Sequence, residues 1–365
     1  MSSPTFYIIP IFVLALISSL YLLPKISQIV TYKKLMDVPN MRSSHSKAIP
    51  HLGGVAFFVL LILSFYFTSR FDENNTIIAI LPGLTILFLL GLKDDLVILS
   101  PFSKLLGQIS AALFLVFHGK ENISSLHGFM GIEDMPVFVS GILGVLIIIV
   151  VVNAINLIDG IDGLAGTVGV IMSSAFGILF FLLKDYFQML TAVVMVGMLL
   201  GFLRFNLSQK RKIFMGDTGS MIIGFVIGVM AVDLLATDTA DLSRLPFNFE
   251  NLPYVVAAIL IIPLFDTGRV FFIRIMQRKS PFTADRNHIH HLIIDHFQVS
   301  HRRTSFYIGV VNFILLSLFI FLAMRTTQWQ LLVVFLLVII VGISFFYFLG
   351  RLIGRKKLKE EEVKI

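Results

Sequence analysis

Two adjacent carboxylates, Asp94 and Asp95, follow Lys93 directly after a long apolar run. Neighbouring carboxylates repel one another and raise each other's proton affinity unless a cation keeps both of them ionised. Such a pair therefore suits a base or a ligand of a hard cation. The alternative is a pair of solvated loop acids, and the pair alone does not decide between these interpretations.

A second polar group interrupts the apolar sequence at residues 153–163. Asn153, Asn156 and Asp159 recur every three residues, which places them on neighbouring positions of one helical face. Two glycines flank Asp162 and permit a turn. Two amides and two carboxylates at the end of a long Ile and Val run have no packing role. Oxygen ligands of this kind suit Mg²⁺ together with phosphate.

Two further segments carry groups that suit a charged ligand. Asp217 lies in a run of small residues that opens an apolar segment, and it is either a cation ligand or a helix N-cap. Lys47 precedes Gly53 and Gly54, and glycines at a helix entrance let backbone N–H groups approach a phosphate. Taken alone, the Lys47 segment is better explained as a basic loop that fixes membrane orientation, with a glycine turn.

The longest polar connection contains Arg286 followed by His288, His290 and His291. Three imidazoles in four positions can hold zinc, but no thiolate accompanies them, because the chain contains no cysteine. The oxygen-rich side chains of the other segments favour anion recognition by Arg286 and the histidines instead.

The elements that must position these groups are predicted to be membrane helices. The 365 residues are 57% hydrophobic and 14% charged, with a mean hydropathy of +0.92, and a soluble fold cannot hide so much apolar surface. About 20 apolar residues suffice to cross the hydrocarbon core. We predict an all-α integral membrane bundle with one domain over 1–350 and a charged cytoplasmic tail over 351–365. Eleven spans are predicted, over residues 5–24, 52–69, 76–92, 101–118, 136–156, 164–183, 187–204, 219–236, 253–272, 306–323 and 329–350.

The first run lacks a preceding basic segment and a small-residue cleavage site, so it is interpreted as a retained span and not a signal peptide. Most of the 29 Lys and Arg lie in the odd-numbered connections and the tail. This asymmetry places those connections and the C-terminus in the cytoplasm and the N-terminus outside. The even-numbered connections carry only Arg70, Lys120, Lys184, Arg244 and Arg325.

The polar groups described above fall on the inside connections, so we expect them to converge on one cytoplasmic site. A carboxylate at the membrane boundary is costly unless it faces water, an ion or a partner. The net charge of +7 fits attraction to anionic headgroups, whereas no basic stripe with interleaved aromatic residues indicates nucleic acid. A transporter is the competing class, but its acids should lie near mid-depth, between a pair of interrupted helices.

Several of these motifs occur together, and in the same order, in a known superfamily. The Asp94-Asp95 pair, the run Asn153 to Gly163, the stretch Phe214 to Ser220 and the segment Asp285 to His291 resemble the WecA/MraY superfamily over roughly residues 33–305. Its members are polyprenyl-phosphate N-acetylhexosamine-1-phosphate transferases. The His-Ile-His-His pattern is similar to the WecA/TagO-type branch, which uses UDP-N-acetylglucosamine, because the peptidoglycan branch carries three consecutive histidines.

The sequence departs from the superfamily pattern at two positions. Ile98 stands where members often carry a further acidic residue, three positions after the Asp pair. His51 stands where arginine is usual, so a fixed positive charge is not expected there.

The resemblance implies transfer of N-acetylglucosamine-1-phosphate from UDP-N-acetylglucosamine to undecaprenyl phosphate, with release of UMP, at the cytoplasmic face of the plasma membrane. This would be the first membrane step of a cell-envelope glycan pathway. The alternative donors are another UDP-N-acetylhexosamine and UDP-N-acetylmuramoyl-pentapeptide. The resemblance also allows a homodimer.

The resemblance further assigns roles to individual residues. Mg²⁺, with Mn²⁺ as a substitute, is expected on Asn156 and Asp217, and Asp94 and Asp95 are expected to be catalytic. The expected substrate-binding residues are Lys47, Asn153, Asp159, Asp162, Arg286, His288, His290 and His291.

Overall fold

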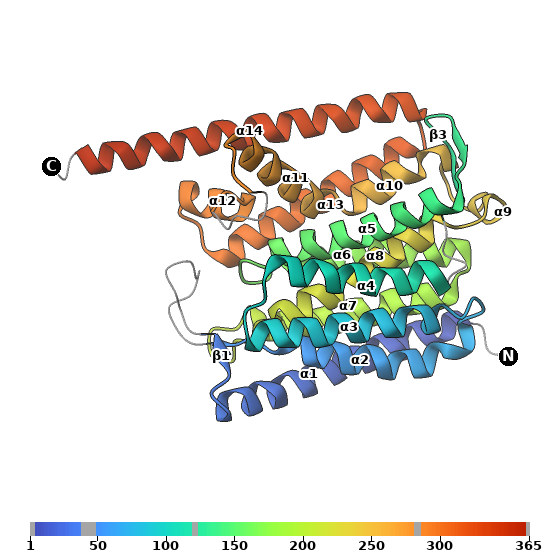
Figure 1. The fold of residues 1–365 in the computed structure, drawn as a ribbon, viewed down its shortest axis with the longest axis horizontal. Helices are drawn as coiled ribbons and strands as arrows, with labels where there is room; N and C mark the ends of the chain where they lie inside the picture. Colours follow the sequence, from blue (N-terminus) through green and yellow to red (C-terminus); the bar gives the residue numbers. More distant parts are fainter. Residues whose placement is uncertain (1–3, 38–48, 119–122, 281–285, 363–365) are drawn as a thin grey trace.

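The computed structural model describes residues 4–37, 49–118, 123–280 and 286–362, with side chains described to residue 352. Most of its long helices run along a common direction (Figure 1). Their bounds are α1 Ile8–Tyr32, α2 Gly53–Thr68, α3 Thr76–Leu96, α4 Pro101–His118, α5 Val137–Ile158, α6 Leu164–Leu183, α7 Tyr186–Asn206, α8 Gly216–Leu235, α9 Thr239–Leu242, α10 Leu252–Ile259, α11 Ile261–Met276, α12 Ile289–Phe297, α13 His301–Ala323 and α14 Gln328–Glu362.

Short elements join the helices. Strands β1 (Met36–Asp37) and β2 (Ile49–Pro50) pair antiparallel, as do β3 (Ser125–Phe129) and β4 (Ile132–Asp134). Three short 3₁₀ helices cover Pro4–Tyr7, Ser69–Phe71 and Phe249–Asn251. The β1–β2 pair and α12 lie at one end of the bundle, whereas β3 and α9 lie at the other (Figure 1).

The chain is an all-α membrane protein, as its composition predicted. Nine helices of the described residues are long and apolar enough to cross a membrane, and α10 with α11 makes a tenth if that bent pair is one span. The remaining predicted run forms α4, whose apolar stretch Pro101–Phe117 is shorter. Each of the eleven predicted runs is therefore found in a helix, or in the bent pair.

The helix α8 forms the centre of the bundle, with 94% of its most apolar window buried by protein. Neighbouring helices approach it closely at glycines. A Cβ on Gly54 of α2 would lie 2.2 Å from the backbone nitrogen of Gly219, and one on Gly224 would lie 2.7 Å from the Cα of Val152 in α5. Small residues at such contacts let membrane helices pack at short range, which fixes the position of the α8 N-terminus.

The predicted span over 253–272 is broken, with a bend of 71° between α10 and α11. Pro263 lies in the first turn of α11 and has no N–H to donate to the carbonyl of Ile259 four residues earlier. The helix therefore stops at Leu260 and restarts in a new direction. This bend tilts α11 relative to α10. Asp266 of α11 then lies beside the first residues of α12.

The helix α14 extends beyond the other helices at the β1 end (Figure 1). It continues to Glu362, so the charged tail predicted from residue 351 prolongs the last helix through most of its length. The polar segments of the odd-numbered connections described below lie at this same end of the bundle.

Candidate active site

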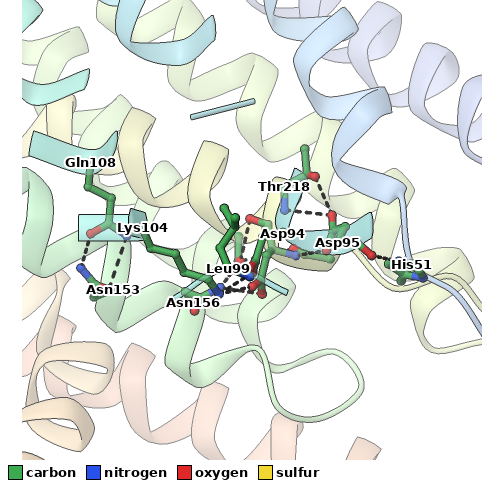
Figure 2. A network of polar contacts seen from close by, with 12 residues as sticks. His51, Asp94, Asp95, Leu99, Lys104, Gln108, Asn153, Asn156 and Thr218 are labelled. Carbon is green, nitrogen blue, oxygen red and sulfur yellow. Dashed lines mark hydrogen bonds and ion pairs between the residues drawn. The ribbon is translucent and has the colours of Figure 1, made fainter. Parts of the chain in front are cut away.

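One ammonium group joins Asp94 to Asp217. Asp94 lies in the last turn of α3 and Asp217 in the first turn of α8. The Nζ of Lys104, from α4, is 2.7 Å from Asp217 Oδ2 and also forms an ion pair with Asp94 Oδ2 (Figure 2). The Asp94 side chain is 5% exposed and that of Asp217 is 34% exposed, so the pair opens to solvent on the Asp217 side.

Asn156 completes this cluster from the end of α5. Its amide nitrogen donates to Asp217 Oδ1 at 3.0 Å and to Ser220 Oγ at 2.8 Å. Asp94 Oδ1 accepts from the backbone N–H of Leu99 at 2.7 Å, which holds the Asp94 carboxylate toward Lys104. Three predicted site residues from three separate helices therefore form one cluster, in which Lys104 contacts the two carboxylates and Asn156 contacts Asp217.

Asp95 points the other way and caps the N-terminus of α8. Its carboxylate accepts from the backbone N–H groups of Asp217 at 2.7 Å and Thr218 at 3.1 Å, and from the Thr218 hydroxyl at 2.5 Å (Figure 2). Free N–H groups and the helix dipole favour a carboxylate at this position. The geometry shows that Asp95 holds the backbone of Asp217, while the catalytic role predicted for Asp95 stays a prediction.

Gly216 makes this capping contact sterically feasible. Its φ is +73°, and a Cβ there would lie 2.2 Å from the His51 carbonyl oxygen and 2.6 Å from Asp95 Oδ2. His51 itself hydrogen-bonds through Nε2 to the Asp95 carbonyl oxygen at 2.9 Å (Figure 2). His51 thus contacts the backbone of the Asp pair.

Replacing Gly216 by alanine is expected to lower the apparent melting temperature of the detergent-solubilised protein markedly more than replacing Gly131. Both glycines have positive φ, which costs an L-residue about 1–2 kcal/mol. Only the Gly216 Cβ meets other atoms, because nothing lies within 4 Å of one at Gly131. Equal decreases in the two variants would show that the contact with Asp95 tolerates a methyl group.

The glycine pair at the start of α2 does not present free N–H groups to a phosphate. Gly53 donates to the carbonyl of Phe214 at 3.1 Å, and Gly54 donates to that of Met215 at 2.9 Å. The expectation that these N–H groups approach a phosphate is therefore wrong. The glycines instead join the start of α2 to the segment directly before α8. Lys47 lies outside the described residues.

Asn153 lies one helical turn before Asn156 and is paired inside the bundle. Its amide nitrogen donates to Gln108 Oε1 at 2.7 Å and to the Ile149 carbonyl at 2.8 Å. Gln108 is only 2% exposed. The structure therefore links Asn153 to α4 one helical turn after Lys104. No hydrogen bond joins the Asn153 side chain to a carboxylate among the described residues.

Asp159 and Asp162 follow the end of α5. Asp162 Oδ2 is 2.5 Å from Lys212 Nζ and 3.8 Å from His301 Nδ1, so its charge is compensated by neighbouring segments. Burial, and then the negative charges of Asp217, Asp95 and Asp162, raises the pKa of Asp159 well above its usual value. Asp159 is thus close enough to Asp217 and Asp95 for their negative charges to disfavour its ionised form.

Replacing Asp159 by asparagine is expected to raise the apparent melting temperature at pH 8 by about 2 °C or more in EDTA. A carboxyl whose pKa is raised by folding stabilises the protein below its unfolded pKa of 3.8, and this stabilisation is lost as the pH rises through the folded pKa. The benefit of asparagine should therefore vanish below pH 4. Asp241→Asn, in an exposed ion pair with Arg244, is the control. The same benefit at both pH values would contradict the raised pKa.

The histidine segment packs against the Asp159–Asp162 turn. A Cβ on Gly160 would lie 2.5 Å from His290 Nε2, and His290 is 1% exposed. Both ring nitrogens of His290 are buried without a hydrogen-bond partner among the described residues. Burial and the neighbouring His291 lower the pKa of His290 to about 3, and burial together with Arg286 lowers that of His291 to about 4. Both rings are therefore neutral at pH 7.

The other two residues of this segment differ in environment. His288 is 6% exposed, and its Nδ1 lies 2.9 Å from a carboxylate oxygen of Asp266 in α11. Arg286 is 3.2 Å from Asp295, with a side chain that is 49% exposed. The histidines lie beside the cluster through Gly160, whereas Arg286 lies at the surface.

The cluster fits a hard cation. Lys104 Nζ forms ion pairs with two carboxylates, so positive charge is favoured between them. The amide group of Asn156 contacts Asp217 Oδ1, and an amide flip would place its oxygen there instead of its nitrogen. Within the described ranges, no three His, Asp or Glu side chains are grouped as a metal site. Mg²⁺ commonly takes only one or two carboxylates and completes its shell with water and substrate phosphates.

The geometry places two carboxylates, an ammonium group and an amide together at one end of a membrane bundle, and this combination suits an enzyme that handles phosphorylated substrates. The sequence model of glycosyl transferase family 4 matches residues 77–235. A probable undecaprenyl-phosphate N-acetylglucosaminyl 1-phosphate transferase of Bacillus subtilis is 30% identical over 92% of this chain and 90% of its own length.

Two further relatives are named undecaprenyl-phosphate alpha-N-acetylglucosaminyl 1-phosphate transferases. The protein of Pasteurella multocida is 36% identical over 71% of each chain, and that of Haemophilus influenzae is 32% identical over 71% of this chain and 72% of its own. The chain belongs to glycosyl transferase family 4 and, within it, to the WecA/TagO-type sugar-phosphate transferases.

Three charged residues of the site were missed by sequence reasoning. Lys104 is the one Lys or Arg of the predicted span 101–118, and Asp266 and Arg269 lie three residues apart within the predicted span 253–272. An ionisable residue inside a membrane span faces a partner or a polar cavity by default. This rule would have found all three, because Lys104 is the one charged residue of its predicted span and Asp266 and Arg269 are the two charged residues of theirs.

Proposed function

We propose that this chain transfers N-acetylglucosamine-1-phosphate from UDP-N-acetylglucosamine to undecaprenyl phosphate and releases UMP. The observation that carries the proposal is the cluster at one end of the bundle in which Lys104 joins Asp94 to Asp217 and Asn156 contacts Asp217. The relatives named above carry this acceptor and the transferred N-acetylglucosaminyl 1-phosphate group in their names.

In the proposed reaction, an oxygen of the lipid phosphate attacks the sugar-linked phosphorus of the donor. The bond from that phosphorus to the bridging oxygen breaks, and the oxygen leaves with UMP. Phosphoryl transfer of this kind depends on alignment and on charge neutralisation. A Mg²⁺ ion held by Asp217 and Asn156 would supply part of that neutralisation.

The protein's own groups supply the alignment. Asp94, fixed by Lys104 and by the Leu99 N–H, is placed to deprotonate or orient the acceptor phosphate beside Asp217. Asp95 holds the α8 N-terminus and so fixes Asp217.

The remaining predicted residues would bind the donor. Asp159 and Asp162 are proposed to hold the uridine. Lys47, Arg286, His288, His290 and His291 are proposed to bind the diphosphate and the sugar. Asn153, also predicted to bind substrate, is paired with Gln108 in the bundle interior.

We further propose that all eleven helical segments cross the plasma membrane, with the N-terminus outside and the site in the cytoplasm. The distribution of Lys and Arg supports this orientation. Labelling of single cysteines introduced at Ser100 and Asp241 tests it, because the chain has no native cysteine. Labelling of both positions from the same side of the membrane would contradict the orientation. Light scattering of the purified protein would test the homodimer.

The function is tested with purified protein in detergent, undecaprenyl phosphate and UDP-N-acetylglucosamine, with UMP release as the readout. We expect lipid-dependent UMP release that stops in EDTA and returns with Mg²⁺. UDP-N-acetylmuramoyl-pentapeptide is offered in parallel reactions. Preference for the peptide-bearing donor would overturn the assignment of the sugar, and absence of UMP with either donor would overturn the function.

A further inference from the structure

Asp266 is a wholly buried carboxylate to which the proposed mechanism gives no role. It lies in α11, beyond the bend at Leu260, and its side chain is 0% exposed. Burying a carboxylate is unfavourable unless other groups compensate for its lost hydration. The groups that compensate it therefore indicate what the residue holds in place.

Three contacts converge on this carboxylate, and two come from the histidine segment. Asp266 Oδ2 lies 2.9 Å from His288 Nδ1, and Oδ1 accepts from the backbone N–H of Ile289 at 2.9 Å. Arg269, one turn further along α11, lies 3.3 Å from Oδ1 and also donates to the carbonyl of Asn287. The Asp266–Arg269 pair thus binds three successive residues before and at the start of α12.

These contacts fix both the backbone and one ring of the segment. His288 is the N-cap residue of α12 and Ile289 its first helical residue, so Asp266 supplies the carboxylate that a helix N-terminus favours. A carboxylate facing Nδ1 requires a proton on that nitrogen, which leaves Nε2 of a neutral ring as the hydrogen-bond acceptor. The ring orientation and the tautomer of His288 then follow from α11.

The contacts of Asp266 also affect the turn that carries Asp159, through His288 and His290. The rings of His288 and His290 lie 5.8 Å apart and nearly parallel, and His290 packs on Gly160 beside Asp159. A shift of the α12 N-terminus would therefore move His290 relative to the turn that carries Asp159. Thus α11 is linked through Asp266 to both predicted substrate-binding segments.

We propose that Asp266 is the positioning residue of the histidine segment, holding His288 with a proton on Nδ1 so that the segment binds the sugar-nucleotide donor. This inference rests on the proposed function. A purely structural alternative is that Asp266 only compensates the buried charge of Arg269. The two differ in whether the effect of Asp266 passes through His288.

The kinetic test is a double-mutant cycle in the UMP-release assay. Asp266→Asn and His288→Ala should each reduce kcat/KM for UDP-N-acetylglucosamine by about 10–100-fold, as for other groups that orient a functional histidine. The double variant should be no worse than the poorer single variant, because both changes remove one interaction. Thr267→Val is the matched control on α11, since the Thr267 hydroxyl has no hydrogen-bond partner among the described residues. A loss of kcat/KM in the double variant equal to the product of the two single losses would overturn the proposal.

A spectroscopic test does not depend on activity. In protein labelled with ¹⁵N-histidine, the His288 signals, assigned by their loss in His288→Ala, should show a protonated Nδ1 in the unmutated chain. In Asp266→Asn the Nδ1 proton should no longer be fixed, and the signals should move toward the Nε2–H tautomer. An unprotonated Nδ1 in the unmutated chain would overturn the positioning role even if Asp266→Asn failed to fold. Absence of UMP release with this signature intact would instead refute the function.

Discussion

Asp217→Asn is expected to reduce UMP release from UDP-N-acetylglucosamine and undecaprenyl phosphate about a thousandfold or more. Asparagine keeps the shape of the side chain and can still pair with Asn156, which lies 3.0 Å from Asp217 Oδ1. It removes the charge that faces Lys104 at 2.7 Å and that is proposed to hold Mg²⁺. A cation at a transferring phosphate stabilises the transition state by several kcal/mol, and each 1.4 kcal/mol changes the rate tenfold.

The control for this variant is Asp241→Asn, which removes an acidic charge from an exposed ion pair at the opposite end of the bundle. Its activity should stay within twofold of that of the unmutated chain. The Asp217→Asn protein should also lose most of the stabilisation that added Mg²⁺ confers in a melting experiment. Activity near that of the control at saturating Mg²⁺ would remove Asp217 from the metal shell.

The site residues at the ends of apolar runs could be predicted from the sequence. Asp94, Asn156 and Asp217 each lie where a predicted span meets an odd-numbered connection. Because successive spans cross the membrane in opposite directions, all odd-numbered connections lie on the same surface. Convergence then follows from topology alone, before any contact is known. The helical class was predictable for a different reason: a membrane span must satisfy its backbone hydrogen bonds internally.

The pairings between segments could not be predicted. Asp95 is adjacent to Asp94 in sequence, yet only the packing of α3 against α8 shows that it caps Asp217's helix. Likewise, Gly53 and Gly54 fit a phosphate loop by their type, and only the positions of the Phe214 and Met215 carbonyls show that their N–H groups are occupied. Such partners lie far apart along the chain, so no local pattern identifies them.

Lys104→Met is expected to separate catalysis from cation binding. The variant leaves Asp94 and Asp217 facing each other without the ammonium group that contacts both. Repulsion between them should displace Asp94 from the position proposed for the acceptor phosphate, and we expect UMP release to fall about 100-fold or more. The measurement is the initial rate at several Mg²⁺ concentrations.

The same substitution is expected to strengthen the response to Mg²⁺. In the unmutated chain the ammonium group of Lys104 would compete with a metal ion for Asp217, whereas in Lys104→Met the ion would have no competitor. The rise in apparent melting temperature on adding Mg²⁺ should therefore be larger in the variant, because a ligand stabilises in proportion to the logarithm of its concentration over Kd. Lys93→Met, which removes an exposed charge from the same helix end as Asp94, should change neither property. A smaller Mg²⁺ response in Lys104→Met would mean that Lys104 and the metal ion do not share this site.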